Sequence, residues 1–163
     1  VIQRLADMVS KNGVLLLSIP QRGDGSIDAE EAAILGDMAS WMAVNGEAIH
    51  GTRPWRVWGE GPTEIREGMH GEGAVGPFTA ADVRFTAKGE TLYAIAMDWP
   101  EDGQPLRITS LGRRATSGRT VQAVELLGAS AVAFEQTDNA LTVRLPGTRP
   151  VAFAPALRVR GLT

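Results

Sequence analysis

Residues 9–55, VSKNGVLLLSIPQRGDGSIDAEEAAILGDMASWMAVNGEAIHGTRPW, decide the fold of this chain. Within them, residues 14–19 (VLLLSI) form an apolar run that lies between Asn12-Gly13 and a Pro-Gln-Arg-Gly-Asp-Gly loop. A strand that is apolar on successive residues is covered on both faces, as parallel strands between helices are. The stretch therefore predicts a buried parallel strand of an α/β domain over residues 14–19.

Helical patterns flank this strand on both sides. Residues 1–11 carry apolar side chains at helical spacing and end at Asn12-Gly13, a common helix stop. Asp28, with Glu31 three residues later, predicts the N-cap of a second helix that ends at Asn45-Gly46. Its apolar stripe consists of Ile34, Leu35, Met38, Trp41 and Met42. Helix, strand and helix in this order are part of a βαβ unit.

No second strand of this kind follows in the chain. A single parallel strand would leave its backbone groups and both of its edges unpaired. We therefore expect its neighbours to lie upstream of Val1, so that the chain is the C-terminal part of a larger α/β protein.

The second half of the chain has an all-β pattern. The turn residues Lys88-Gly89-Glu90 and Asp138-Asn139 separate short alternating segments. Strands are predicted over residues 83–86, 91–97, 106–108, 120–127, 132–136, 141–145 and 156–159. Strands of this length and spacing predict an antiparallel β-sandwich.

A segment rich in glycine and proline, with no stable period, joins the two parts. We assign residues 1–57 to the C-terminal end of the α/β domain, residues 58–78 to a linker and residues 79–163 to the β-sandwich. The large rings of Trp41, Trp55 and Trp58 flank this connection, and such rings commonly hold two layers or domains together.

The composition excludes some classes of protein. Apolar residues make up 44% of the chain and charged residues 21%, as in ordinary globular proteins. The net charge of −3 argues against a nucleic-acid partner. No apolar run approaches the length of a membrane span. The chain has no cysteine and hence no disulfide.

Two motifs have a chemical and a structural interpretation. Residues 71–76 match the letters of the dinucleotide motif GxGxxG, but glycine-rich coil precedes them and Pro77-Phe78 follows, so a loop is favoured. His50 and His70 lack neighbours at metal-ligand spacing, and no metal site is predicted.

Four acids occupy the connection: Glu60, Glu64, Glu67 and Glu72. Paired carboxylates carry out glycoside hydrolysis, one as acid/base and the other as nucleophile or base. Acids in a polar connection are more often solvated, and the pattern does not predict the burial that tunes a carboxylate.

Ser18, Gln21, Arg22 and Asp24 are the stronger candidates for a site. They lie at or beyond the C-terminal end of the predicted strand, the edge that carries the site in α/β barrels and open α/β sheets. In the alternative interpretation, residues 23–25 form a turn in which Asp24 accepts hydrogen bonds from nearby amides and Arg22 is solvated.

These stretches resemble a known family. VSKNGVLLLSIPQRGDGSID (9–28) and WMAVNGEAIHGTRPW (41–55) are similar to the end of the catalytic domain of the α-L-fucosidases, family 29 of the glycoside hydrolases. AADVRFTAKGETLYAIAMDWP (80–100) resembles the first strands of that family's C-terminal β domain. Ser18, Pro20-Gln21 and His50 depart from the commoner Asn, Gly-Pro and Tyr of the family.

The resemblance implies a (β/α)8-like barrel followed by a C-terminal β-sandwich. It implies retaining hydrolysis of terminal α-L-fucose from glycans through a covalent intermediate, with an aspartate nucleophile and a glutamate acid/base. In the family both catalytic residues precede the segment seen here, so we expect no catalytic residue in this chain. Ser18, Gln21, Arg22 and Asp24 become the expected rim of the substrate pocket.

The resemblance also sets expectations for cofactors and partners. It implies no metal and no organic cofactor. The expected partners are a fucosylated glycan substrate and the N-terminal barrel portion of the same protein, with no nucleic acid and no membrane. The residues leave the compartment undecided; a periplasmic or secreted location is the one suspected, with any signal region outside these residues.

A function of another class remains open on the residues alone. The β part could be a non-catalytic carbohydrate-binding or scaffolding module, which would need exposed aromatic rings on one face. The available rings are Phe85, Tyr93, Trp99, Phe134 and Phe153, and the strand pattern would bury most of them.

Overall fold

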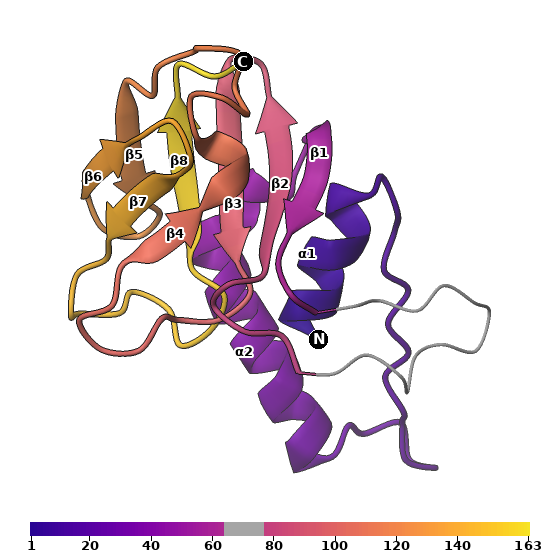
Figure 1. Ribbon diagram of the computed structural model, residues 1–163. Coiled ribbons are helices and arrows are strands. Elements are labelled where there is room, and N and C mark those ends of the chain that lie inside the picture. Colours follow the sequence, from indigo (N-terminus) through magenta and orange to yellow (C-terminus); the bar gives the residue numbers. More distant parts are fainter. Residues whose placement is uncertain (64–76) are drawn as a thin grey trace.

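A computed structural model describes residues 1–63 and 77–163. Figure 1 shows two helices near one face of a β-sheet and a smaller sheet over its other face. The helices come from the N-terminal third of the chain, and all strands except the first follow residue 82. The described part of the chain is therefore β-rich, with the helices on one side.

Both predicted helices are present. Helix α1 (Ile2–Ser10) ends where Asn12 takes a left-handed φ of 65° and the Gly13 N–H donates to the Met8 carbonyl at 2.7 Å. Helix α2 (Ala29–Asn45) begins at Asp28, whose Oδ1 accepts from the N–H groups of Glu30 and Glu31. A short 3₁₀ helix, η1 (Gly46–Ala48), follows directly. The caps read from the sequence are thus confirmed in both helices.

The buried parallel strand predicted over residues 14–19 is absent from the described structure. These residues belong to no helix or strand, and the side chains of Val14 and Leu16 are 87% and 93% exposed. A strand needs a neighbour to pair its backbone groups, and no described segment lies alongside this one as a strand. Of the predicted helix-strand-helix barrel unit, the two helices are therefore present and the strand between them is not confirmed.

The larger sheet has five antiparallel strands in the order β1-β2-β3-β8-β5. Their bounds are β1 (Arg53–Glu60), β2 (Val83–Lys88), β3 (Thr91–Ala96), β8 (Ala156–Arg160) and β5 (Ala123–Leu126). Strand β1 was not predicted, since it lies in the segment interpreted as connection. It pairs with β2 across an irregularity between Pro54 and Gly59, which conceals its period in the sequence.

The smaller sheet has three antiparallel strands in the order β4-β7-β6. They are β4 (Leu106–Ile108), β7 (Leu141–Arg144) and β6 (Ala133–Gln136), and a 3₁₀ helix, η3 (Thr109–Leu111), follows β4. In β4 and β7 the buried residues alternate with more exposed ones, as the pattern predicts for strands with one wet face.

One apolar core joins these layers. It includes Leu92, Ile95 and Leu157 of the larger sheet and Ile108 and Leu141 of the smaller sheet, all fully buried. The inner strands β2 and β3 are buried on successive residues because the small sheet covers one face and helices approach the other. The antiparallel β-sandwich predicted from strand spacing is confirmed.

A buried ion pair attaches α1 to the larger sheet. Arg84 of β2 is only 2% exposed, and its Nε lies 2.6 Å from Oδ1 of Asp7 on α1. Its Nη1 also donates to the carbonyls of Glu60 and Val83. Trp58 of β1 lies against the guanidinium, with the ring centre 5.0 Å away. The helix is thus held by a charged contact as well as by apolar packing.

Trp41 joins α2 to the sandwich, as the sequence indicates, whereas Trp55 packs within the larger sheet. The Trp41 indole is buried and donates its Nε1–H to the Ala154 carbonyl, and Trp55 meets Phe85 edge to face at 5.4 Å.

Candidate functional site

The four predicted rim residues lie in one exposed segment between α1 and α2. Ser18, Gln21, Arg22 and Asp24 are all exposed, and none belongs to a helix or strand. Gln21, Arg22 and Asp24 are close in sequence, and Ser18 precedes them across Ile19-Pro20. Their placement as the rim of a sugar pocket stays a prediction.

The loop around Asp24 forms a closed turn. Asp24 Oδ1 accepts from the hydroxyl of Ser26 at 2.7 Å and from its N–H at 3.0 Å. Arg22 N–H donates to the Ser26 carbonyl, and Gly25 N–H donates back to Arg22. The hydrogen bonds from Ser26, the side-chain one foremost, hold the pKa of Asp24 below its ordinary value. Asp24 therefore has the turn-forming contacts of the structural interpretation.

The other residues weighed for chemistry have structural contacts where they are described. The carboxylate of Glu60 accepts from the N–H groups of Thr109 and Ser110 at 2.7 and 2.6 Å, at the start of η3. His50 is exposed, and its N–H donates to the Gly46 carbonyl. Glu64, Glu67, His70, Glu72 and residues 71–76 lie outside the described residues. Over residues 1–63 and 77–163, no three His, Asp or Glu side chains gather to hold a metal.

Neither described helix is both long and apolar enough to cross a bilayer.

Arg158 of β8 lies between two carboxylates. Its Nε donates to Glu47 Oε1 at 3.0 Å, its Nη2 also meets Glu47, and its Nη1 lies 2.6 Å from Glu125 Oε2. The hydrogen bond with Glu47 is the main reason that the pKa of Arg158 lies above its ordinary value. Burial raises the pKa of the adjacent Tyr93. This cluster ties η1 to strands β5 and β8 of the larger sheet.

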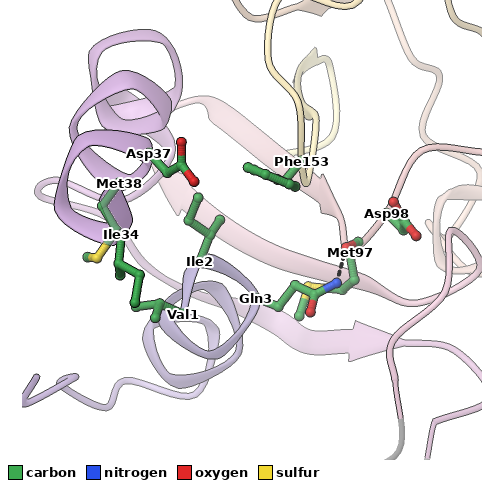
Figure 2. Close-up of a pocket in the computed structure, with 9 residues that line it drawn as sticks. All are labelled: Val1, Ile2, Gln3, Ile34, Asp37, Met38, Met97, Asp98 and Phe153. Atoms are coloured by element: carbon green, nitrogen blue, oxygen red, sulfur yellow. Dashed lines mark hydrogen bonds between the residues drawn. The ribbon is translucent and has the colours of Figure 1, made fainter. Parts of the chain in front are cut away.

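A hollow of about 320 Å³ lies between the helices and the sandwich. Figure 2 shows it with Ile34, Asp37 and Met38 of α2, the first residues of α1, and Phe153 from the loop between β7 and β8. Gln3 donates from its side-chain amide to the Met97 carbonyl at 2.6 Å. The predicted rim residues do not line this hollow.

Asp37 was not a candidate from the sequence, and Phe153 was named only among the five aromatic rings of the β part. Most of these rings were expected to be buried, and Phe153 is the one that is exposed, with 47% of its surface accessible. It lies outside every strand, between Pro150 and Pro155, and this flanking pair is the signal that could have identified an exposed loop.

Comparisons with known proteins agree with the resemblance. The family model described as α-L-fucosidase matches residues 1–47, and the model of the α-L-fucosidase C-terminal domain matches residues 77–160, just over half of the chain.

Two curated relatives are similar along nearly the whole chain. An α-L-fucosidase from Branchiostoma floridae is 30% identical over 99% of this chain and 32% of its own length. The tissue α-L-fucosidase of Homo sapiens is 30% identical over 99% of this chain and 31% of its own length. The chain thus spans about a third of the length of these relatives.

Solved structures show the same fold. The α-fucosidase of Thermotoga maritima, in complex with a mechanism-based inhibitor, superposes with a TM-score of 0.71 at 23% identity. The superposition covers 98% of this chain and 34% of the Thermotoga maritima chain. Isoenzyme 1 from Paenibacillus thiaminolyticus gives a TM-score of 0.69 at 24% identity, over 98% of this chain and 33% of its own. Since two family models match in order and this fold recurs in α-fucosidases, the chain belongs to the α-L-fucosidase family.

Proposed function

We propose that this chain is the C-terminal third of a retaining α-L-fucosidase, which hydrolyses terminal α-L-fucose from glycans through a covalent intermediate. The observation that carries the proposal is the order of the two family matches, residues 1–47 and then 77–160, within a third of the length of the relatives. In this proposal the chain supplies the last barrel strand and the accessory β domain. The nucleophile and the acid/base belong to the remainder of the protein.

The exposed segment between the helices supports the barrel part of the proposal. Val14 and Leu16 are almost fully exposed, while Leu15, Leu17 and Ile19 are half-buried. Large apolar side chains so exposed mark a surface that another polypeptide covers. In the proposed enzyme residues 14–19 pair with barrel strands of the N-terminal portion, and Ser18, Gln21, Arg22 and Asp24 then form the rim of the sugar pocket.

We retain a division into residues 1–57, 58–78 and 79–163 as barrel end, linker and β-sandwich. Strand β1 (Arg53–Glu60) crosses the first of these limits and pairs with β2, so it joins the barrel end to the sandwich. The proposed domains consequently share one sheet.

The alternative function, a carbohydrate-binding module without catalysis, needs several exposed rings on one face. Phe85, Tyr93 and Trp99 are buried and Phe134 is half-buried, whereas Phe153 is exposed. Of these five rings one is exposed, which favours a contact within an enzyme over a dedicated module.

Turnover of 4-nitrophenyl α-L-fucoside tests the proposal. The protein that contains this chain together with its N-terminal portion should release nitrophenol, and residues 1–163 alone should not. A 4-nitrophenyl β-D-galactoside serves as control substrate. Turnover by residues 1–163 at the rate of the longer protein would contradict the placement of the nucleophile.

A further inference from the structure

Two buried indoles fix the loop that carries Phe153. Trp99 donates its Nε1–H to the Val151 carbonyl at 3.1 Å, and Trp41 donates its Nε1–H to the Ala154 carbonyl at 3.0 Å. Ala154 is fully buried and has a left-handed φ of 40°, which is strained for a residue with a Cβ. Between these anchored backbone positions lies Phe153, with 47% of its surface exposed.

Two hollows are lined by this ring. The hollow of about 320 Å³ in Figure 2 and a second of about 150 Å³ share two residues, Phe153 and Asp37. Ser40 of α2 and Pro150 line the second hollow. The two hollows therefore make a groove that passes along α2, with the Phe153 ring and the Asp37 carboxylate at its middle.

Three side chains that line this groove, those of Asp37, Asp98 and Gln3, offer acceptor atoms. Asp37 makes no hydrogen bond or ion pair with any residue in the described part of the chain. Oδ1 of Asp98 accepts from the Trp99 N–H, which leaves Oδ2 to accept from a ligand. The side-chain amide of Gln3 donates to the Met97 carbonyl, which leaves the side-chain carbonyl oxygen of Gln3 to accept from a ligand. Such a groove favours a ligand with many O–H donors and disfavours an anion.

An apolar polypeptide would fit the groove less well. It would cover the carboxylate of Asp37 without offering a donor, and burying an unpaired charge is costly. A sugar ring offers both features that the groove requires. Its C–H groups pack on the face of an aromatic ring, and its hydroxyl groups donate to carboxylates at the edge.

We propose that Phe153, Asp37 and Asp98 form a binding site for a neutral saccharide. Phe153 stacks on a sugar ring, and Asp37 and Asp98 accept hydrogen bonds from its hydroxyls. The site deepens the proposed function, on which the choice of a fucosylated ligand rests: it holds part of the glycan on the face between α2 and the sandwich.

Saturation-transfer NMR and a shift titration with 2′-fucosyllactose test this site on residues 1–163. The unmodified chain should show saturable binding with a Kd on the order of 1 mM. F153A should weaken binding by about tenfold, F153W should retain it, and D37N should weaken it about threefold. Thermal melts confirm that each variant is folded, which is expected because Phe153 and Asp37 are on the surface.

Two matched variants guard against unspecific effects. Trp58→Ala removes another ring that is 44% exposed, and Asp102→Asn neutralises another exposed carboxylate, so both should bind as the unmodified chain does. No saturable binding by the unmodified chain, equal binding by F153A, or an equal loss in W58A would each overturn the proposal. Binding in residues 1–163 is measured apart from fucoside turnover by the longer protein, so either proposal can fail without the other.

Discussion

At the scale of single residues, Asp82 organises the start of β2. It is fully buried, and its carboxylate accepts hydrogen bonds from the N–H and hydroxyl groups of both Thr63 and Thr79, at 2.8–2.9 Å. Burial acts to raise the pKa of Asp82, but these hydrogen bonds outweigh it and the pKa lies below 3.8. Asp82 thus holds together two points of the chain that flank residues 64–76.

Stability should therefore depend on the charge of Asp82. The folded-state pKa lies below the unfolded value, so the contribution is fully present above pH 3.8 and is lost as the pH falls through the lower, folded-state value. Asp82→Asn should lower the free energy of unfolding at neutral pH by about 1–3 kcal/mol.

Urea unfolding at neutral pH and at pH of about 3 measures both effects. The difference between D82N and the unmodified chain should shrink at the lower pH. Asp24→Asn is the matched control: its carboxylate also has a lowered pKa but is fully exposed, and little change is expected. A D82N difference that does not depend on pH would contradict the charge argument.

Individual contacts also show which interactions a sequence pattern can predict. Asp28 is recognisable as a cap because its partners lie two and three residues away. Asp7 and Arg84 are 77 positions apart, and no local rule pairs two such charges. Asp37 and Phe153, from α2 and the β7–β8 loop, are brought to one groove only by the tertiary fold. The rim residues were chosen from a strand end, a rule that applies only once the neighbouring strands are in place.

At the scale of elements, most strands of the sandwich were recognisable because turn residues bound them and several of them alternate. Two segments differ from their sequence-based predictions. Strand β1 contains Pro54 and Gly59, residues that normally argue against a strand, and it is tolerated at the edge of the sheet. Residues 14–19 have the composition of a strand but need partners to become one.

Two glycines in different elements should respond to alanine in opposite ways. Gly36 lies in the interior of α2 with no atom near its missing Cβ, so Gly36→Ala should stabilise the chain by about 0.5–1 kcal/mol. A Cβ on Gly59 of β1 would lie 2.6 Å from the Val83 carbonyl oxygen and 2.8 Å from Arg84 Cδ. Gly59→Ala should destabilise it by about 1–3 kcal/mol. Thermal melts of both variants test this, and equal shifts in one direction would contradict it.

At the scale of the whole molecule, the apolar surface of residues 14–19 should govern association. Residues 1–163 alone should self-associate through Val14 and Leu16, since no described residue covers them. The double variant Val14→Thr/Leu16→Thr should be largely monomeric. The control variant Val57→Thr alters a less exposed side chain on β1, and it should self-associate as the unmodified chain does. Sedimentation velocity measures the outcome. A monodisperse unmodified chain would contradict the expectation.

The buried pair of Asp7 and Arg84 also bears on modularity. A β domain excised after Lys11 would lose both Asp7, the counter-ion of Arg84, and the helix that packs over this part of the sheet. Recombination between homologues at this junction would meet the same difficulty, unless both partners of the pair came from one parent. The helix and the sandwich should therefore be inherited as a single evolutionary unit, although separate family models describe them.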